Sequence, residues 1–182
     1  MSAIHVPRNE KDISGISQKE GISAELLFKS IVLASGGEWR ASSKYQNRKL
    51  HIDCFVGGVS FDIKAAKRIA RNRGNGLIQD KFHWAEHTGI TGYPGWTHSR
   101  HLQRIAFQML DGRFLIVHRT ELSNLLSTRV DFCRGLRAKC QHEAKNGLLW
   151  TRRGRKDAMT LFSTEQLLQL KGSVFWGINT CT

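Results

Sequence analysis

Residues 51–68 read HIDCFVGGVSFDIKAAKR, and this stretch decides the fold that the sequence predicts. Two runs of alternating residues flank Gly57-Gly58, and a glycine pair in that position is a strong signal for a β-hairpin with a two-residue turn. Pairing outward from this turn sets Asp53 directly opposite Asp62. Two acids that are nine residues apart in the sequence are therefore expected to be neighbours in space.

Successive side chains of a strand point to opposite faces, so the hairpin has two faces of different character. The apolar face is expected to be core and carries Leu50, Ile52, Cys54, Val56, Val59, Phe61, Ile63 and Ala65. The polar face carries His51, Asp53, Phe55, Ser60, Asp62 and Lys64, with His51 opposite Lys64. A slip of one residue would bury the charges, so the register is strongly fixed.

The opposed acids indicate a site rather than a plain surface. Directly opposed side chains have Cβ atoms about 4.5–5.5 Å apart, and two carboxylates at that separation repel each other. A shared proton, a nearby cation such as Lys64 or a metal ion would relieve this repulsion. A hard ion such as Mg²⁺ suits two carboxylates together with water and phosphate, and such a site hydrolyses phosphodiester bonds. The alternative is an exposed polar face on which Lys64 simply offsets Asp62.

This order of residues resembles the PD-(D/E)XK nuclease superfamily, which includes restriction endonucleases and Holliday-junction resolvases. GISAELLF offers a helical Glu25, HIDCF offers Asp53, and FDIK offers Asp62 and Lys64. The resemblance covers about residues 17–70. Ile52 stands where the pattern often has proline, and Asp62 replaces the more frequent glutamate.

The resemblance implies a restriction-endonuclease-like α/β domain, with a central mixed β-sheet flanked by helices. It implies a Mg²⁺-dependent DNA endonuclease, with Mn²⁺ as a substitute ion, and a small resolvase-like homodimer that acts on branched or junction DNA. Glu25, Asp53, Asp62 and Lys64 would be catalytic, and the three acids would hold the metal. For Glu25 the alternative is a surface ion pair with Lys29, four residues along the helix.

The net charge of +13 favours a polyanionic partner, DNA first and RNA as the alternative. Lys64 leads into a basic run in which residues 64, 67, 68 and 71 share one face of a predicted helix. A second basic cluster, TRRGRK, lies at a predicted hairpin tip. The expected nucleic-acid contacts are Lys44, Lys67, Arg68, Arg71, Arg73, Arg152, Arg153 and Arg155. Solvated charge runs are the alternative. Trp84, Tyr93 and Trp96 are candidates for base stacking or for packing.

Residues 1–16 are expected to form a flexible arm, and residues 17–182 a single domain. The polar N-terminus has no signal-like apolar region and no stretch is apolar enough for a membrane span, so a cytoplasmic location without a membrane partner is expected. Helices are predicted from Ser17 to Gly36 with apolar positions 22, 26, 28, 31, 32 and 33, after Thr120, and after Ser163. A short strand is predicted near 38–45 with a polar turn after it, a hairpin around Asp111-Gly112, and another around GRK at 154–156.

Three other functions remain open. A non-catalytic nucleic-acid-binding protein or an RNase could use the same scaffold. A zinc-stabilised interaction protein could use Cys133, Cys140 and His142, although their spacing matches no standard zinc motif and unpaired thiols in a reducing cell are the simpler interpretation. The pairs His83/His87 and His98/His101 could each lie on one helical face and bind a metal.

Overall fold

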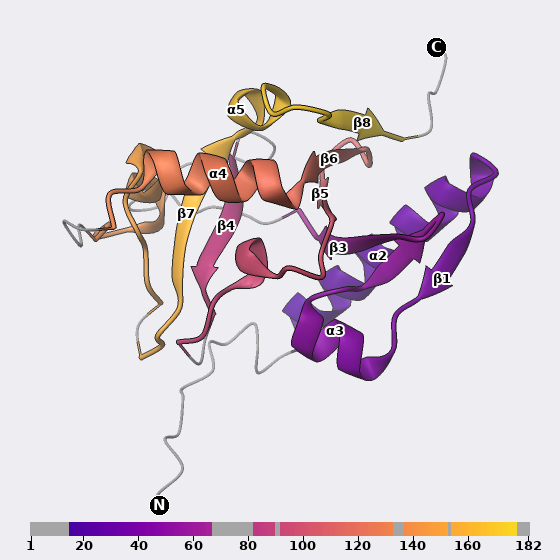
Figure 1. Ribbon diagram of the computed structural model, residues 1–182, viewed down its shortest axis with the longest axis horizontal. Coiled ribbons are helices and arrows are strands. Elements are labelled where there is room, and N and C mark those ends of the chain that lie inside the picture. Colours follow the sequence, from indigo (N-terminus) through magenta and orange to yellow (C-terminus); the bar gives the residue numbers. More distant parts are fainter. Residues whose placement is uncertain (1–14, 67–81, 90–91, 133–136, 153, 178–182) are drawn as a thin grey trace, which may run out of the picture.

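The computed structural model describes residues 15–66, 82–89, 92–132, 137–152 and 154–177. In this part of the chain, helices flank a mostly antiparallel six-stranded sheet, and a two-stranded sheet packs beside it (Figure 1). The expected mixed α/β architecture is thus present. None of the described helices is long and apolar enough to cross a membrane.

The large sheet has the strand order β1-β2-β3-β5-β6-β8. Its strands are Trp39–Ala41 (β1), Cys54–Val56 (β2), Val59–Lys64 (β3), Arg104–Gln108 (β5), Phe114–His118 (β6) and Val174–Trp176 (β8). The pairing of β3 with β5 is parallel, and the other neighbouring strands of this sheet are antiparallel. The small sheet pairs Phe82–Thr88 (β4) with Ala158–Ser163 (β7).

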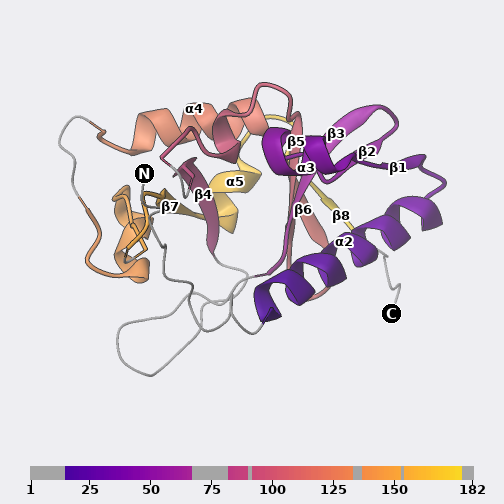
Figure 2. The same cartoon turned by 90° about the horizontal axis from the view of Figure 1, so that it is seen from below.

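Within the described segments, four α-helices and two 3₁₀ helices surround these sheets. They are Ile16–Ala34 (α2), Lys44–Leu50 (α3), Arg119–Arg129 (α4), Thr164–Leu168 (α5), Trp96–His98 (η1) and Gln141–Asn146 (η2). Figure 2 shows α2 on one side of the large sheet, with α4 and the β4–β7 sheet on the other side. The large sheet is therefore the middle layer of the structure.

The predicted hairpin has the predicted register. Val56 pairs with Val59 across Gly57-Gly58, and both glycines have positive φ angles of 54° and 83°, as a type I′ turn requires. Beyond the Cys54–Phe61 pair, the Asp53 N–H donates to the Phe61 carbonyl at 2.8 Å. The hairpin thus brings Asp53 alongside the strand that carries Asp62.

The chain before Asp53 differs from the prediction. A strand reaching back to Leu50 was expected, with a polar turn before it, but residues 44–50 form the helix α3. Ser43 and Gln46 form a capping box that begins this helix. His51 then takes a left-handed conformation with φ 56° as the C-cap, so it does not pair with Lys64 in the ladder.

Helix α2 covers the apolar face of the hairpin. The ring of Phe28 is fully buried and contacts four other aromatic rings, including Phe61 and Phe114 of the sheet. The predicted helix end is correct, because Gly36 has φ 75° and its N–H donates to the Leu33 carbonyl. The predicted start is wrong: the helix begins one residue earlier, after Gly15, and no side chain caps it.

The predicted apolar stripe of α2 is only partly correct. Positions 28, 31 and 32 are buried, whereas Ile22, Leu26 and Leu33 are about half exposed or more. Ala24 is buried instead, because its small side chain lets the helix approach the sheet.

The opposite face of the sheet packs against α4, α5, η1 and the small sheet, which together bury the second apolar cluster. The β5–β6 hairpin around Asp111-Gly112 and the capping box at Ser163 are as predicted. Thr120 is not the cap of α4, because the helix begins at Arg119. The hairpin around residues 154–156 is reduced to one bridge, Trp150–Met159, because β7 pairs mainly with β4.

We expect Phe28→Ala to lower the free energy of unfolding by about 3–5 kcal/mol, since it leaves a cavity between α2 and the sheet. Leu26→Ala on the same helix is the control, because its side chain is 62 % exposed and its removal should cost well under 1 kcal/mol. Urea denaturation measures both. Phe28→Leu keeps the test possible if the alanine variant does not fold, and equal midpoints for the two positions would contradict this packing.

Candidate active site

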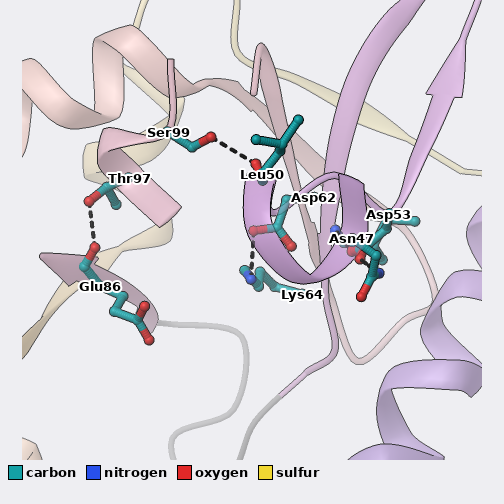
Figure 3. Close-up of polar contacts among 9 residues, drawn as sticks. Asn47, Leu50, Asp53, Asp62, Lys64, Glu86, Thr97 and Ser99 are labelled. Carbon is teal, nitrogen blue, oxygen red and sulfur yellow. Dashed lines mark hydrogen bonds and ion pairs between the residues drawn. The ribbon is translucent and has the colours of Figure 1, made fainter. Parts of the chain in front are cut away.

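Two carboxyl groups meet where β2 begins. The Asp53 carboxylate accepts a hydrogen bond of 2.7 Å from the backbone N–H of Ile63, so it lies over strand β3 beside Asp62 (Figure 3). Asp62 is only 3 % exposed. The hairpin therefore brings the two acids together, as the sequence predicted, but Asp62 and Ser60 of the polar face are buried, because η1 and the β4–β7 sheet pack on that side.

Lys64 supplies the positive charge of this group. Its ammonium lies 2.6 Å from Asp62 Oδ2, two residues along the same face of β3. The same ammonium lies 4.6 Å from the centre of the Trp96 ring, which is itself buried. A cation over an aromatic face is stabilised by the ring, so Trp96 is a packing residue here and not an exposed stacking surface.

The two acids disturb each other's ionisation. Burial, followed by the charge of Asp62, raises the pKa of Asp53 to about 7, against the opposing effects of the Ile63 N–H and Lys64. Burial also raises the pKa of Asp62, although Lys64 lowers it. Near neutral pH the pair therefore retains a proton unless further positive charge enters the site.

Helix α3 borders the site and is fixed to it at two points. The Asn47 side chain donates a 2.7 Å hydrogen bond to Asp53 Oδ1. At the end of the helix, the Ser99 hydroxyl donates to the Leu50 carbonyl at 2.7 Å. Asp53 is thus held by β3 through one oxygen and by α3 through the other.

Glu25 approaches from the opposite layer. It lies on α2 and is partly buried. Burial, followed by the charge of Asp53, raises its pKa, which places it within electrostatic reach of that carboxylate. Asp53, Asp62 and Lys64 thus lie together, and Glu25 is coupled to Asp53 from the side of α2. Among the described residues, no three acidic, histidine or cysteine side chains lie close enough together to hold a metal ion by themselves.

Glu86 of β4 was not predicted near the site, yet its negative charge contributes to the raised pKa of Asp62. His51 was predicted opposite Lys64; it lies outside the ladder, and burial, followed by the charge of Lys64, lowers its pKa. Figure 3 shows Glu86 on the strand that faces Asp62 and Lys64. The only available signal for Glu86 was a β-strand pattern far from the hairpin, and no local spacing connects it to Asp62.

The position of Glu86 depends on close backbone packing. The β4–β7 ladder is irregular between Glu86 and Thr88, and such bulges re-aim side chains. Thr97 of η1 donates to the Glu86 carbonyl at 2.5 Å. A Cβ atom on Gly95 would lie 2.4 Å from that carbonyl oxygen, so glycine permits the contact between η1 and β4.

The histidine pairs lie differently from the prediction. His83 and His87 are on strand β4 and not on a helix; His83 contacts Thr164, while His87 Nδ1 lies 2.8 Å from Nε2 of His98. His98 is therefore paired with His87 rather than with His101. In the proposed zinc string, Cys140 is a free thiol and Cys133 lies outside the described residues.

Few of the predicted nucleic-acid contacts lie where the structure can place them. Lys67, Arg68, Arg71, Arg73 and Arg153 lie outside the described residues. Arg152 forms an ion pair with the fully buried Asp157, so it holds the loop before β7 in place. Arg155 is partly buried in the same loop, away from the hairpin. Lys44 is exposed at the start of α3, one turn before Asn47, which donates to Asp53.

No family model matches the chain, and no curated protein or solved structure matches it either. The chemistry of the site is therefore inferred from its own residues.

In the presence of EDTA, we expect Asp53→Asn to gain stability relative to the natural protein as pH rises. A carboxyl whose folded pKa is raised stabilises the fold below its unfolded pKa, near 4, and loses this contribution as pH rises to the folded value near 7. The difference between the two proteins should change by about 1–3 kcal/mol between pH 4 and pH 8.

Asp111→Asn is the control for this experiment. Burial raises the pKa of Asp111 slightly, but its hydrogen bonds with Arg113 outweigh this and lower it. Its stabilising effect is present above the unfolded pKa, so its variant should change in the opposite direction. Thermal unfolding from pH 4 to 8 measures both, and parallel curves for Asp53→Asn and the natural protein would contradict the coupled acids.

We expect Gly95→Ala to cost about 1–3 kcal/mol, because its methyl group would separate η1 from β4. The backbone at Gly95 has φ −74°, which alanine adopts freely, so the loss would come from this contact alone. Gly21→Ala, inside α2, is the matched control, since no atom lies within 4 Å of the new methyl group. Because alanine favours the helix, this change should raise the free energy of unfolding by as much as about 1 kcal/mol. Urea denaturation that ranks the two variants otherwise would contradict the close approach.

Proposed function

We propose that this chain is a Mg²⁺-dependent DNA endonuclease that hydrolyses phosphodiester bonds. The observation that carries the proposal is the pairing of the Asp53 and Asp62 carboxyl groups in a buried site that contains Lys64 and adjoins Glu25. Burial raises the pKa of both carboxyl groups and the charge of Asp62 adds to this at Asp53, so ionising the pair destabilises the fold. A function that uses the pair is the simplest reason for its position.

The donor set suits a hard divalent ion. Asp53 and Asp62 offer carboxylate oxygens, Glu25 lies nearby, and Mg²⁺ is commonly held by one or two carboxylates together with water and substrate phosphate. When bound, the ion would polarise the phosphate and activate a water molecule. It would also supply the positive charge that the acidic pair lacks near neutral pH.

The protein's own residues have separate tasks in this proposal. The Ile63 N–H and Asn47 orient the Asp53 carboxylate. Lys64, held between Asp62 and the Trp96 ring, places a positive charge where negative charge develops on the phosphate. Glu25 is positioned to orient a water molecule from the side of α2.

The order of the elements supports a restriction-endonuclease-like fold. The chain runs from a helix with Glu25 to a hairpin with Asp53 and the Asp62-x-Lys64 tripeptide, and then to a strand parallel to β3. This is the order of residues in the PD-(D/E)XK pattern that the sequence resembles. The net charge of +13 favours a nucleic-acid substrate.

We expect metal-dependent cleavage of at least one labelled substrate among single-stranded, duplex and four-way-junction DNA and RNA. Each substrate is incubated with Mg²⁺, Mn²⁺ or EDTA. Asp62→Asn and Lys64→Met should each lower the rate by about 100-fold or more, because each removes charge from the reacting centre. Glu25→Gln should also lower it, whereas Asp111→Asn, which changes an acid far from the site, should leave it unchanged.

A metal titration gives a second readout that does not depend on the substrate. Mg²⁺ should raise the melting temperature of the natural protein at pH 8 and have little effect on Asp53→Asn. If the protein binds nucleic acid in a salt-sensitive way but cleaves no substrate, the nuclease proposal is wrong and the protein is a nucleic-acid-binding protein. If it cleaves RNA alone, it is an RNase.

A further inference from the structure

Helix α3 carries a cationic surface that the packing of the protein does not use. Its sequence, KYQNRKL, has three basic residues and no acid, and none of its side chains is buried. Lys44, Arg48 and Lys49 are all exposed, and with the other described residues their side chains form no ion pair or hydrogen bond. These charges therefore contribute little to the stability of the fold.

The helix is nevertheless rigidly placed. A capping box fixes its first turn, and the Ser99 hydroxyl holds its last carbonyl. In the middle, Asn47 donates to the same Asp53 carboxylate that we assign to the active site. Any group bound on α3 is thus held at a defined position relative to the acidic pair.

The three cations do not point in the same direction. Residues three or four apart share a face of a helix, so Lys44 and Arg48 lie together, with Lys44 adjacent to Asn47. At about 100° per residue, Lys49 is turned about 160° away from Asn47. By the same rule Lys44 lies about 60° from Asn47 and Arg48 about 100° from it, so these two cations are nearer the site than Lys49, which is turned farthest from it.

We propose that Lys44 and Arg48 bind the phosphate backbone of the DNA strand next to the phosphate that is cleaved. This inference rests on the proposed function, and it adds the surface that positions the substrate. Phosphate contacts fix the position of DNA without reading its sequence. An arginine and a lysine on one helical face can each contact a backbone phosphate, and the arginine can do so with two parallel hydrogen bonds.

Charge complementarity selects this occupant over a protein partner. The surface carries three basic residues, and its one large exposed hydrophobic side chain is Tyr45, which is 66 % exposed and turned about 160° away from Asn47. The side of the helix that leads to Asn47 is therefore polar and positively charged, as a phosphate backbone requires. Asn47 joins the two parts, because its amide ties α3 to Asp53 at 2.7 Å. The backbone would then lie across α3 and enter the site from that side.

The test measures DNA binding and cleavage separately. Fluorescence anisotropy with labelled single-stranded, duplex and four-way-junction DNA and with RNA, in EDTA and over a range of salt, gives Kd without turnover. Lys44→Ala and Arg48→Ala should each weaken binding about 3- to 10-fold and reduce the salt slope by about one. With saturating DNA and Mg²⁺, kcat should change less than twofold.

Lys49→Ala is the matched control, since it removes the same charge from the opposite face of the same helix. It should change Kd less than twofold. Alanine preserves helix propensity, and circular dichroism together with the melting temperature verifies that α3 and the fold are intact. The double variant Lys44→Ala/Arg48→Ala should lose about 10- to 100-fold in affinity.

The outcomes separate this inference from the nuclease proposal. If the natural protein cuts DNA but Lys49→Ala weakens binding as much as the other two variants, the inference is wrong and the nuclease stands. If only the Lys44 and Arg48 variants weaken binding but no substrate is cut, the proposed DNA-binding surface is supported and the nuclease proposal is wrong. Absence of DNA binding, or RNA binding that is at least tenfold tighter, overturns the DNA assignment.

Discussion

The hydrogen bond from the Ile63 N–H to the Asp53 carboxylate is the contact on which the site depends. It exists because a two-residue glycine turn fixes the register of β2 and β3, and this register leaves Asp53 beside the strand that carries Asp62. One strand thus supplies an acid, a backbone donor and, through Lys64, a counter-charge. The remaining elements add to this arrangement: α3 through Asn47, α2 through Glu25, and β4 with η1 through Glu86 and Trp96.

The arrangement is costly for the folded chain. The positive charge of Lys64 does not compensate both carboxyl groups. Lys64 contacts Asp62, and at Asp53 it only partly offsets the rise in pKa that burial and Asp62 cause. A chain selected for stability alone would place an apolar or amide side chain at one of these positions. Proteins accept such local conflicts at functional sites, and a divalent cation would turn the repulsion into binding energy.

The predictable part of the site is the local part. The register of the hairpin follows from Gly57-Gly58 and from alternation, and both span only a few residues. The sequence predicts the capping box at Ser163, whereas the same spacing at Ser43 and Gln46 precedes a run of polar residues that is also typical of a turn. This second capping box begins a helix where a turn and the start of a strand were predicted. As the C-cap of that helix, His51 lies outside the ladder.

The unpredictable part is made by contacts between distant segments. Glu86 lies on β4, a strand of the other sheet, and comes near Asp62 only through the packing of that sheet against the large one. The exposed Leu26 and Leu33 show a related limit of prediction. The spacing of apolar residues predicts that α2 is a helix, but it does not predict how much of the helix surface the sheet covers, because that depends on the packing of other segments.

The parallel pairing of β3 with β5 also has a consequence for the order in which the protein folds. The β2–β3 hairpin closes through a two-residue turn, but the next pairing joins residue 61 to residue 104 and must close a long loop first. Local contacts form faster than non-local ones. We therefore expect the two acids and Lys64 to come together early and in water, and to lose that water only when β5, η1 and β4 pack against the hairpin. The chain thus assembles its charges first and desolvates them last, so the cost of burying them is borne at the end of folding, when most of the other contacts already exist.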